Sequence, residues 1–471
     1  MSLDQSAGLV RSDDGVGAAS SARAIVVGIL AALAGLMFGL DTGVIAGALG
    51  FIGDEFHAGA RMQEWIVSSM MAAAALGSMA AGRISFHFGR RRALLGASLL
   101  FLAGSVACAL APSISVLIAG RVLLGLAVGI AAFAAPLYIS EITVEAVRGA
   151  MVSFYQLMVT LGIFLAYVTD SLLSYGAHWR WMLGLMAVPA ALFCLGCAVL
   201  PDSPRWLMMR GDSKRARQVM LHLRRDPTEA DAEIRDIAQE LRKPGGNGGA
   251  LFWTNANFRR SVMLGVALQI MQQLTGINVL MYYAPKIFQA AHFGVSASTW
   301  ATALLGLINM ASTGFAIAFI DRWGRRPLLI LSCAIMTAAM LGAGGLMMLG
   351  GDSLAQQIGM VAALLTFVAG FAIGAGPLVW TLCAEIQPLR GRDFGIACST
   401  FTNWAANWLI SNVFLTMMAA LGEAVTFGLF ALMNGLFVVI TLLYVPETRG
   451  VSLEEIEARL MSGRRLRDLG R

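Results

Sequence analysis

The chain has 471 residues, of which 58% are hydrophobic and 13% charged, whereas soluble globular proteins are roughly 45–50% apolar and about 25% charged. This composition excludes a water-soluble fold. The net charge of +6 does not indicate a nucleic-acid partner, because the basic residues cluster in the segments between the apolar runs.

Apolar runs of about 20 residues, long enough to cross a bilayer, recur from residue 24 to residue 446. They are continuous, whereas the strands of a membrane barrel would alternate polar and apolar residues. We therefore predict an all-α membrane protein with twelve transmembrane helices. The expected spans are 24–50, 64–84, 93–111, 114–138, 150–173, 181–200, 259–290, 299–320, 327–349, 355–384, 393–420 and 424–445. The first run continues through Asp41 without a cleavage signature, so we expect a retained span rather than a signal peptide.

Basic residues gather in alternate loops and in one long polar segment. They are Arg90, Arg91 and Arg92; Lys214, Arg215, Arg217, Arg224 and Arg225; Arg322, Arg325 and Arg326; and Arg390 and Arg392. The positive-inside rule makes these segments cytoplasmic. An even number of spans then places both chain termini in the cytoplasm as well.

The long polar segment divides the chain into two halves whose motifs repeat. Gly89-Arg90-Arg91 returns as Gly324-Arg325-Arg326, and two further signatures return in the same order, which indicates duplication of a six-span unit. We expect an N-terminal tail (1–23), an N-terminal six-helix half (24–200), a cytoplasmic helical linker (201–257), a C-terminal six-helix half (258–446) and a C-terminal tail (447–471). A transporter of two such halves binds its substrate between them near the bilayer midplane.

No motif indicates an enzyme, a metal site or a cofactor. The sequence lacks the G-x-x-x-x-G-K-[ST] phosphate loop and the H-E-x-x-H zinc motif, so ATP-driven pumping is not expected. Cys194 and Cys197 have C-x-x-C spacing, but no second ligand pair accompanies them. All six cysteines lie in apolar runs and are expected to fill the core.

Asp41 lies deep in the first apolar run, where an ionised carboxylate is costly. Burial disfavours its charged form and a nearby cation favours it, so an opening and closing cavity could load and release a proton there. Arg121, inside the fourth span, is the candidate cation. From the residues alone, a static ion pair that fixes the first and fourth spans explains the two charges equally well.

Amide side chains within the expected spans are few and concentrated. They are Gln156 in the fifth span; Gln269, Gln272, Gln273 and Asn278 in the seventh; Asn309 in the eighth; and Asn403 and Asn407 in the eleventh. Unpaired amides in hydrocarbon are costly, so these must face partners or a wet cavity. Hydrogen bonds between helices are the alternative explanation.

Several motifs together resemble the sugar porter family of the major facilitator superfamily, in particular the bacterial galactose-proton and arabinose-proton symporters. The motifs are Gly82 to Arg92, Gly120 to Gly125, Pro201 to Arg205, Gln272 to Asn278, Asp321 to Arg326 and Pro446 to Gly450. The resemblance covers residues 24 to about 465. One departure is Phe86, which stands where the loop motif commonly carries an acid, whereas Asp321 keeps the acid in the second half.

The resemblance implies the major facilitator fold and secondary active uptake of a monosaccharide coupled to proton symport. It favours a proton-coupling role for Asp41 with Arg121, because proton-linked members have an acid at the matching position. It also implies a bacterial inner-membrane protein that acts as a monomer, with sugar, proton and lipid as its partners and no cofactor. A galactose- or glucose-type hexose is the first expectation, and arabinose the next.

A sugar needs neutral donors and acceptors around its hydroxyls and an aromatic surface against its C–H face. The family match assigns sugar contact to Gln156, Gln272, Gln273, Asn278, Asn309 and Asn407, with Trp380 as the stacking platform. It assigns closure of the outer gate to Tyr282 and Tyr283, which precede Pro285, where we expect the helix to break. An interfacial aromatic belt is the competing interpretation of the two tyrosines.

Charged residues at the cytoplasmic span ends form a second set of candidate gating residues. They are Glu141, Arg148, Asp321, Arg322, Glu385, Arg390 and Arg392. Such a network could hold the halves together when the carrier faces outward and release them when it faces inward. The competing interpretation is ordinary interfacial charge that snorkels to the membrane surface.

Two other functions remain open from the sequence. A facilitative sugar uniporter would use the same fold and pocket without moving protons. A membrane sugar sensor would use the same pocket but usually adds a long signalling tail, whereas the tail after Glu447 is short.

Overall fold

The structure is a computed structural model, and it describes residues 14–224, 226–242, 248–349, 353–388 and 390–470. These ranges are helical throughout, with short connections and no strand. Because a helix satisfies its own backbone hydrogen bonds, this is the fold that uninterrupted apolar runs predict for a chain in lipid. The all-α prediction is confirmed.

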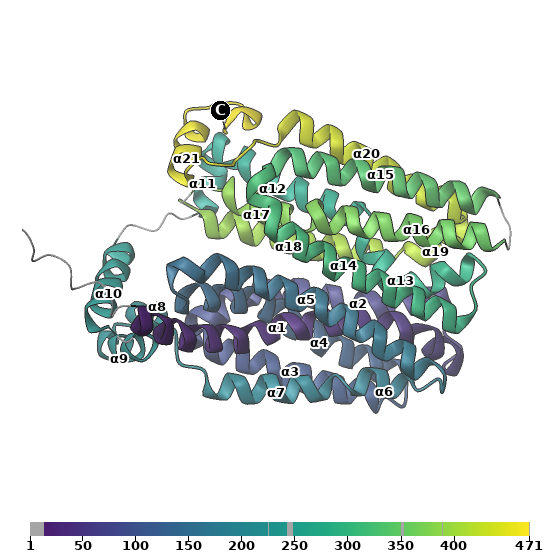
Figure 1. Cartoon of the computed structure of the whole chain (residues 1–471), viewed down its shortest axis with the longest axis horizontal. Coiled ribbons are helices and arrows are strands. Elements are labelled where there is room, and N and C mark those ends of the chain that lie inside the picture. The colour runs from purple at the N-terminus through teal and green to yellow at the C-terminus, as the bar shows by residue number, and fades with distance from the viewer. Residues whose placement is uncertain (1–13, 225, 243–247, 350–352, 389, 471) are drawn as a thin grey trace, which may run out of the picture.

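The helices form two bundles that lie one above the other in Figure 1. The N-terminal bundle consists of α1 (Asp14–Glu55), α2 (Ala60–Phe88), α3 (Arg90–Ala109), α4 (Ile114–Ile142), α5 (Glu145–Ser174), α6 (Trp179–Gly184) and α7 (Ala187–Val199). The C-terminal bundle consists of α12 (Ala256–Leu274), α13 (Ile277–Ala290), α14 (Val295–Trp323), α15 (Arg325–Leu349), α16 (Leu354–Gly370), the π-helix η1 (Phe371–Ala375), α17 (Gly376–Glu385), α18 (Arg392–Ser411), α19 (Phe414–Leu421) and α20 (Glu423–Tyr444).

Short helices outside the bundles gather at one end of the molecule, which we name the linker end. They are α8 (Pro204–Met209), α9 (Ser213–Leu223), α10 (Pro227–Arg242), α11 (Gly248–Thr254), α21 (Leu453–Met461) and the 3₁₀-helix η2 (Leu466–Asp468). The opposite end, where α1 is followed by α2, is named the far end. Buried Arg224 joins α9 to Glu233 of α10 at 2.9 Å and to the Ile142 carbonyl of α4 at 3.1 Å, so α9 and α10 are bonded to the N-terminal bundle.

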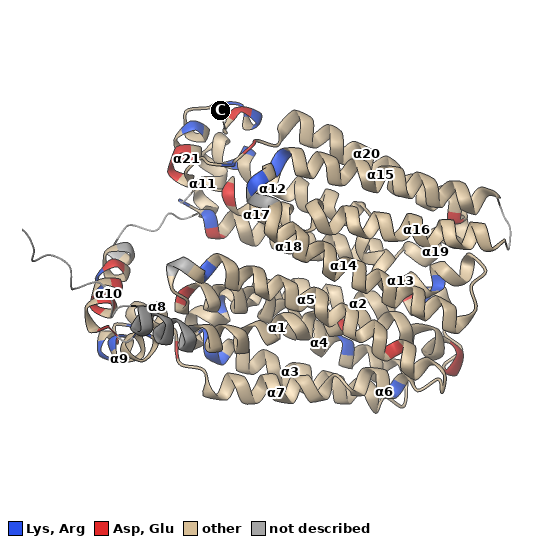
Figure 2. Cartoon of the chain, in the orientation of Figure 1, with Lys and Arg blue, Asp and Glu red and all other residues tan. Residues whose placement is uncertain are grey.

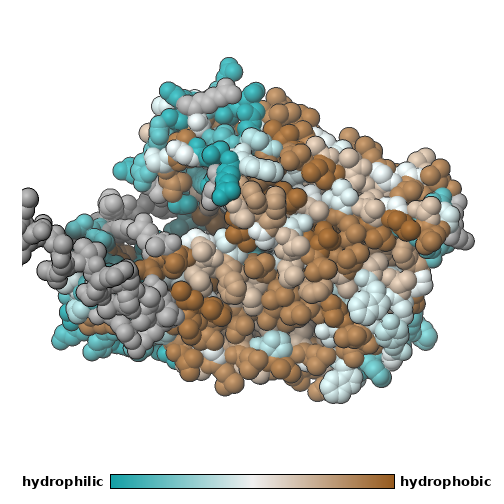
Figure 3. Space-filling model, in the orientation of Figure 1, coloured by the Kyte–Doolittle hydropathy of each residue, from teal (hydrophilic) through white to brown (hydrophobic). Residues whose placement is uncertain are grey.

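Within the described residues, eleven helices are long and apolar enough to cross a membrane, and twelve if the bent pair α18 and α19 counts as one span. This agrees with the twelve expected spans. Figure 2 shows that most charged residues lie at the two ends, with few along the helices between them. Figure 3 shows a broad hydrophobic belt over the same middle region.

The repeated Gly-Arg-Arg motif makes the same turn in both bundles. Gly89 joins α2 to α3 with φ +90°, and Gly324 joins α14 to α15 with φ +87°. Only glycine adopts this backbone conformation without strain, which explains why it stands at both turns. The repeat seen in the sequence is therefore a repeat of structure.

Helix α1 packs against α5 along a stripe of glycines spaced four residues apart. A Cβ atom added to Gly35, Gly39, Gly43 or Gly47 would lie less than 3.0 Å from atoms of α5. At Gly39 the clash is with backbone, 1.9 Å from the Val159 carbonyl oxygen. Small residues at such spacing let transmembrane helices approach closely.

The seventh span breaks at Gly276 and not at Pro285, which corrects the sequence expectation. Gly276 has φ +90° and separates α12 from α13, whereas Pro285 lies inside α13. Proline leaves the carbonyl four residues earlier, that of Met281, without its helical N–H donor. The hydroxyl of Tyr167 on α5 donates to that oxygen at 2.7 Å, so the other bundle stabilises the proline inside the helix.

Two spans of the C-terminal bundle also depart from regular helix. The tenth span contains the π-helix η1, which ends at Ala375, directly before Gly376 and Pro377. The eleventh span bends by 41° between Ser411 and Phe414. Both irregularities free backbone groups, and side chains from other helices bond to these groups in the candidate site.

Candidate functional site

Asp41 of α1 and Arg121 of α4 form a buried ion pair. The carboxylate oxygen Oδ1 of Asp41 lies 2.7 Å from Nη1 of Arg121, and both side chains are fully buried. Nε of Arg121 also donates to the Ile66 carbonyl at 3.4 Å. The pairing expected from the sequence is therefore present.

The pair is not fully satisfied by its surroundings. Among the described residues, Oδ2 of Asp41 and Nη2 of Arg121 have no hydrogen-bond partner. Desolvation of two ions is costly, and it is offset only when the remaining donors and acceptors are bonded.

A cluster of amides joins α12 to α18 and to the π-helical segment. Asn403 donates its Nδ2 to Oε1 of Gln269 at 2.6 Å and to Oε1 of Gln272 at 2.9 Å. Gln272 in turn donates to the carbonyls of Ala375 at 2.8 Å and Gly376 at 3.1 Å. The π-helical turn presents these carbonyls to α12, and π-helical turns recur at functional sites.

The amides continue along α13 on the other side of the break at Gly276. Asn278 donates to Oε1 of Gln273 at 2.6 Å, and Asn407 donates to the hydroxyl of Tyr282 at 3.2 Å. These bonds pair Gln273 with Asn278 and Asn407 with Tyr282, and the assignment of these residues to sugar contact or gating stays a prediction. We name the amides Gln269, Gln272, Gln273, Asn278, Asn403 and Asn407 the amide cluster.

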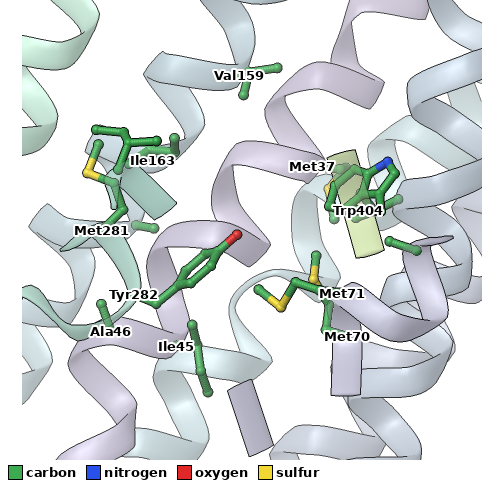
Figure 4. Packing of buried hydrophobic residues seen from close by; sticks show 14 of the residues in the cluster. Met37, Ile45, Ala46, Met70, Met71, Val159, Ile163, Met281, Tyr282 and Trp404 are labelled. Carbon is green, nitrogen blue, oxygen red and sulfur yellow. The ribbon is translucent and has the colours of Figure 1, made fainter. Parts of the chain in front are cut away.

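Apolar and aromatic side chains of both bundles surround the hydroxyl of Tyr282. Figure 4 shows Tyr282 within the packed hydrophobic cluster that also contains Met37, Met71, Ile163 and Trp404. The ion pair and the amide cluster lie on helices that contact each other across the bundles, because Phe38 of α1 packs against Trp404 of α18.

Trp404 was missed by the sequence analysis. Its ring packs against Phe38 of α1 with 5.6 Å between ring centroids, and its Nε1 has no partner among the described residues. Asn403 and Gln269 were recognised as amides but not assigned to the sugar site. The signal that could have found Trp404 is its spacing, one residue after Asn403 and three before Asn407 on the same helix.

Three predicted sugar contacts lie outside the bonded cluster. Gln156 on α5 is half-buried, Asn309 on α14 is 6% exposed, and Trp380 on α17 is 42% exposed. Among the described residues, no hydrogen bond joins these side chains to the amide cluster. Trp380 stands one turn after Gly376, whose carbonyl accepts from Gln272, so it is attached to the same segment.

At the linker end, the two bundles carry matching charged networks. Glu141 accepts from Arg90 at 2.8 Å and from Ser203 at 2.5 Å, and all three residues belong to the N-terminal part. Glu385 accepts from Arg325 at 3.2 Å and from Thr448 at 2.5 Å, all in the C-terminal part. The residues of the repeated sequence motifs therefore form the same network of bonds in each half of the chain.

The other predicted gating residues at this end are not bonded to Glu141 or Glu385 in the described contacts. Arg148, Arg322 and Arg390 are exposed and Arg392 is half-buried. Asp321 lies in α14, but its side chain is outside the described part of the structure. The acids pair instead with the arginines of the Gly-Arg-Arg turns.

At the far end, polar bonds join the two bundles directly. Oε1 of buried Glu64 accepts from the backbone N–H of Thr416 at 2.7 Å, and Oε2 accepts from the Thr416 hydroxyl at 2.8 Å. Arg61 donates to the Asn412 carbonyl at 2.6 Å, and Ser68 donates to Oδ1 of Asn412 at 3.1 Å. The sequence analysis did not identify these residues.

The bent eleventh span supplies acceptors for these bonds at Asn412 and donors at Thr416. Tyr283 donates its hydroxyl to the Ser411 carbonyl at 2.9 Å and stacks on Phe414 at 5.2 Å between ring centroids. Tyr282 and Tyr283 are both almost fully buried, so they do not belong to an aromatic belt at the membrane interface. The bundles are bonded to each other at the far end, whereas the acidic networks at the linker end each lie within one bundle.

Comparison with known proteins identifies the family. The family model described as "Sugar (and other) transporter" matches residues 27–460. The chain belongs to this sugar transporter family. Within the family, it is 52% identical to the galactose-proton symporter of Escherichia coli K12 over 455 residues, which covers 96% of this chain and 98% of the relative. It is 47% identical to the arabinose-proton symporter of the same strain over 451 residues, or 94% and 95% of the two chains.

Solved structures of the family have the same fold. The partially occluded inward-open form of the xylose transporter XylE from E. coli superposes with a TM-score of 0.81 at 27% identity, covering 92% of this chain and 100% of XylE. The proton:xylose symporter XylE bound to 6-bromo-6-deoxy-D-glucose gives 0.79 at 28% identity, covering 93% and 99%. The sugar porter resemblance and the major facilitator fold are therefore confirmed. As a member of a transporter family, the protein is not an enzyme.

Proposed function

We propose that this protein takes up a monosaccharide in symport with protons by alternating access. The observation that carries the proposal is the fully buried ion pair of Asp41 and Arg121, with Phe38 of the same helix α1 packed against Trp404 beside Asn403 of the amide cluster. The relatives at 52% and 47% identity are named as galactose-proton and arabinose-proton symporters. A galactose- or glucose-type hexose is the first substrate, and arabinose the second.

The Asp41 carboxylate is the proposed proton carrier. When Asp41 binds a proton, its charge is neutralised and its attraction to Arg121 is lost, which frees α1 to move relative to α4. When the site opens to water on the other side of the membrane, hydration and Arg121 favour the ionised form of Asp41, and the proton passes to water. Such a group couples proton binding to a change in how two helices pack.

The amide cluster is the proposed sugar site, with Gln156, Asn309 and Trp380 joining it when sugar is bound. Neutral amides present both donors and acceptors to hydroxyls. Trp404 and Trp380 offer aromatic faces for the C–H side of the ring. The amide bonds described in the site are those that sugar hydroxyls would replace, so binding leaves few buried polar groups unpaired.

The proposed orientation puts the linker end in the cytoplasm of a bacterial cell, in the inner membrane. The arginines of the linker and of the Gly-Arg-Arg turns support it, because positive residues favour the cytoplasmic side. The bonded far end then makes this an inward-facing form.

The proposed domain boundaries are those expected from the sequence, namely halves at 24–200 and 258–446 and a linker at 201–257. A monomer contains both halves and is the proposed functional unit, without a cofactor.

The gating roles are proposed on the same basis. Tyr282 and Tyr283 with the far-end bonds close the outer side. Glu141 and Glu385 are proposed to bond across the two halves when the carrier faces outward. The loss of these bonds in the inward-facing form would leave each acid with the arginine of its own half. The other candidate gating residues, Arg148, Asp321, Arg322, Arg390 and Arg392, belong to helix ends and connections at the same linker end.

Sugar-evoked current in reconstituted vesicles tests the proposal. Galactose, glucose and arabinose are added at several pH values to the wild type, to Asp41→Asn and to Asp170→Asn. Asp170 is a matched control, because it is also fully buried but bonds only to the backbone N–H of Gly47, at 3.1 Å. We expect a pH-dependent current that Asp41→Asn abolishes while sugar exchange persists, and that Asp170→Asn keeps.

The other outcomes separate the alternatives. Sugar exchange without current in the wild type would make the protein a uniporter. Sugar binding without exchange or current would favour a sensor. A full pH-dependent current in Asp41→Asn would remove that carboxylate from proton coupling. The same currents rank the sugars.

A further inference from the structure

A large groove lies on the outer side of the C-terminal bundle at the linker end. Its volume is about 1090 Å³, and it runs between α12, α20 and the segment around η2. Ligand pockets in proteins typically measure roughly 300–1,000 Å³, so the groove has room for more than a small ion. It does not include any residue of the amide cluster or of the Asp41 and Arg121 pair.

The walls of the groove divide into an apolar part and a basic part. The apolar part consists of Met263, Leu264, Ala267, Ile440, Leu443 and Tyr444, which lie within the membrane spans Ala256–Ala290 and Glu423–Tyr444. The basic part consists of Arg259 and Arg260, close to where the first of these spans begins, and of Arg465 and Arg467, after the second has ended. The groove therefore crosses the border between the hydrocarbon core and the head-group region.

The basic part is strongly positive. Its four arginines face a single acid, Asp468. Arg259, Arg260, Arg465 and Arg467 are exposed, and the described ion pairs do not include them. Arginine binds phosphate oxygens through several N–H donors at once, and it is weakly hydrated compared with lysine.

The groove is held open by a folded tail rather than by a loose terminus. Ile456, Leu460 and Leu469 form a small hydrophobic core of their own. Arg459 donates to the Leu469 carbonyl at 2.8 Å, and Nδ2 of Asn257 donates to the Met461 carbonyl at 3.1 Å. These bonds fix the tail against α12, so the arginines of two distant segments converge on one space.

We propose that this groove binds one anionic glycerophospholipid of the leaflet at the linker end. The phosphate contacts the four arginines, and the acyl chains lie along the apolar wall of α12 and α20. Charge complementarity selects an anionic lipid over a zwitterionic one, and the apolar wall selects a lipid over a soluble anion. The site is separate from the sugar site and does not rest on the proposed transport function.

Native mass spectrometry of the purified, delipidated full chain tests the proposal. Phosphatidylglycerol and phosphatidylcholine with identical acyl chains are titrated separately, and glycerol phosphate is added as a soluble competitor. The wild type is expected to bind one molecule of phosphatidylglycerol roughly tenfold more tightly than phosphatidylcholine. Millimolar glycerol phosphate is expected to leave the bound lipid in place.

Variants assign the binding to the groove. Arg259→Gln with Arg467→Gln should lower phosphatidylglycerol affinity about tenfold. Arg83→Gln with Arg92→Gln removes the same charge from exposed positions at the linker end of the N-terminal bundle and should change affinity less than about twofold. Ala267→Trp fills the groove without altering charge and should lower occupancy by both lipids.

Three results would overturn the proposal. They are equal affinity of the wild type for the two lipids, an equal loss in the control arginine pair, and displacement of the lipid by glycerol phosphate. If the arginine variant does not fold, unchanged lipid binding by Ala267→Trp would also reject it.

Discussion

Asp41 and Arg121 stabilise each other, and each is costly when left alone. Removing one partner of a buried ion pair leaves an uncompensated charge, whereas removing both leaves none. The same reasoning applies to the amide cluster, where Asn403 serves two acceptors at once. At the scale of single residues, the consequences of a substitution depend on the partner that remains.

We predict strong coupling between Asp41→Asn and Arg121→Gln in thermal unfolding of the detergent-solubilised protein. Arg121→Gln alone should destabilise by about 3–5 kcal/mol, because Asp41 then has no cation. The double variant should lose less stability than the sum of the two single variants. Additive losses would mean that the two side chains do not stabilise each other.

We predict that Asn403→Ala weakens sugar binding roughly 2- to 10-fold, which corresponds to one hydrogen bond of about 0.5–1.5 kcal/mol. Gln269 and Gln272 would lose their shared donor and no longer be oriented toward the site. Equilibrium binding of labelled sugar measures the change. Asn434→Ala is the control, because Asn434 is a buried amide of α20 that bonds to the Thr275 carbonyl outside the cluster. An equal loss in both variants would point to a general packing defect.

The long helices differ in how closely they approach each other and in where they break. Helices α1 and α5 touch backbone to backbone along the glycine stripe, so any relative motion there must occur by sliding or rotation of whole helices. At Gly276, at η1 and after Ser411 the regular helix is interrupted. Each of these breaks leaves backbone carbonyls without a helical donor, and side chains of other helices bond to them. At the scale of the helices, the candidate site lies beside the places where regular helix is interrupted.

We predict that Gly39→Ala is strongly destabilising, whereas Gly50→Ala in the same helix is not. A Cβ at position 39 would lie 1.9 Å from the Val159 carbonyl oxygen, but a Cβ at position 50 meets nothing within 4 Å. Overpacking typically costs about 1–3 kcal/mol, and backbone neighbours cannot move aside. Melting temperatures of the two variants check this, and similar values would show that α1 and α5 are not packed as closely as described.

The two bundles act as bodies that are bonded at the far end and carry self-contained networks at the linker end. The Glu64 bonds to Thr416 cross from one bundle to the other, whereas the Glu141 bonds to Arg90 stay within one. A carrier that rocks between two forms needs the balance of such bonds to shift. At the scale of the whole molecule, the two ends therefore differ in whether their bonds cross between the bundles.

We predict that Glu64→Gln shifts the protein toward the outward-open form. The amide cannot accept from both Thr416 and Arg61 as the carboxylate does, so the far end is held less tightly. Spin-label distances across the far end should then lengthen, and the change should be larger than in Arg180→Gln, which removes a far-end ion pair with Glu55 inside the N-terminal bundle. Unchanged distances in Glu64→Gln would show that these bonds do not hold the far end closed.

The sequence by itself determined the helical class, the number of spans and the repeat. Hydrocarbon excludes unpaired backbone, so apolar length alone specifies helices, and a buried charge or amide is conspicuous in such a run. These are local properties. They single out Asp41 and Arg121, which the structure pairs, and the buried amides, whose role in sugar binding stays a prediction.

Only the tertiary structure decided where the helices break and what closes the far end. Pro285 was expected to end a helix, but Tyr167 of the other bundle satisfies the carbonyl that the proline frees. Glu64 and Asn412 carry no local signal of a gate, since their partners lie about 350 residues away in the sequence. The physical reason is that the sequence shows which polar groups need a hydrogen-bond partner, whereas the packing of distant helices determines which partner they have.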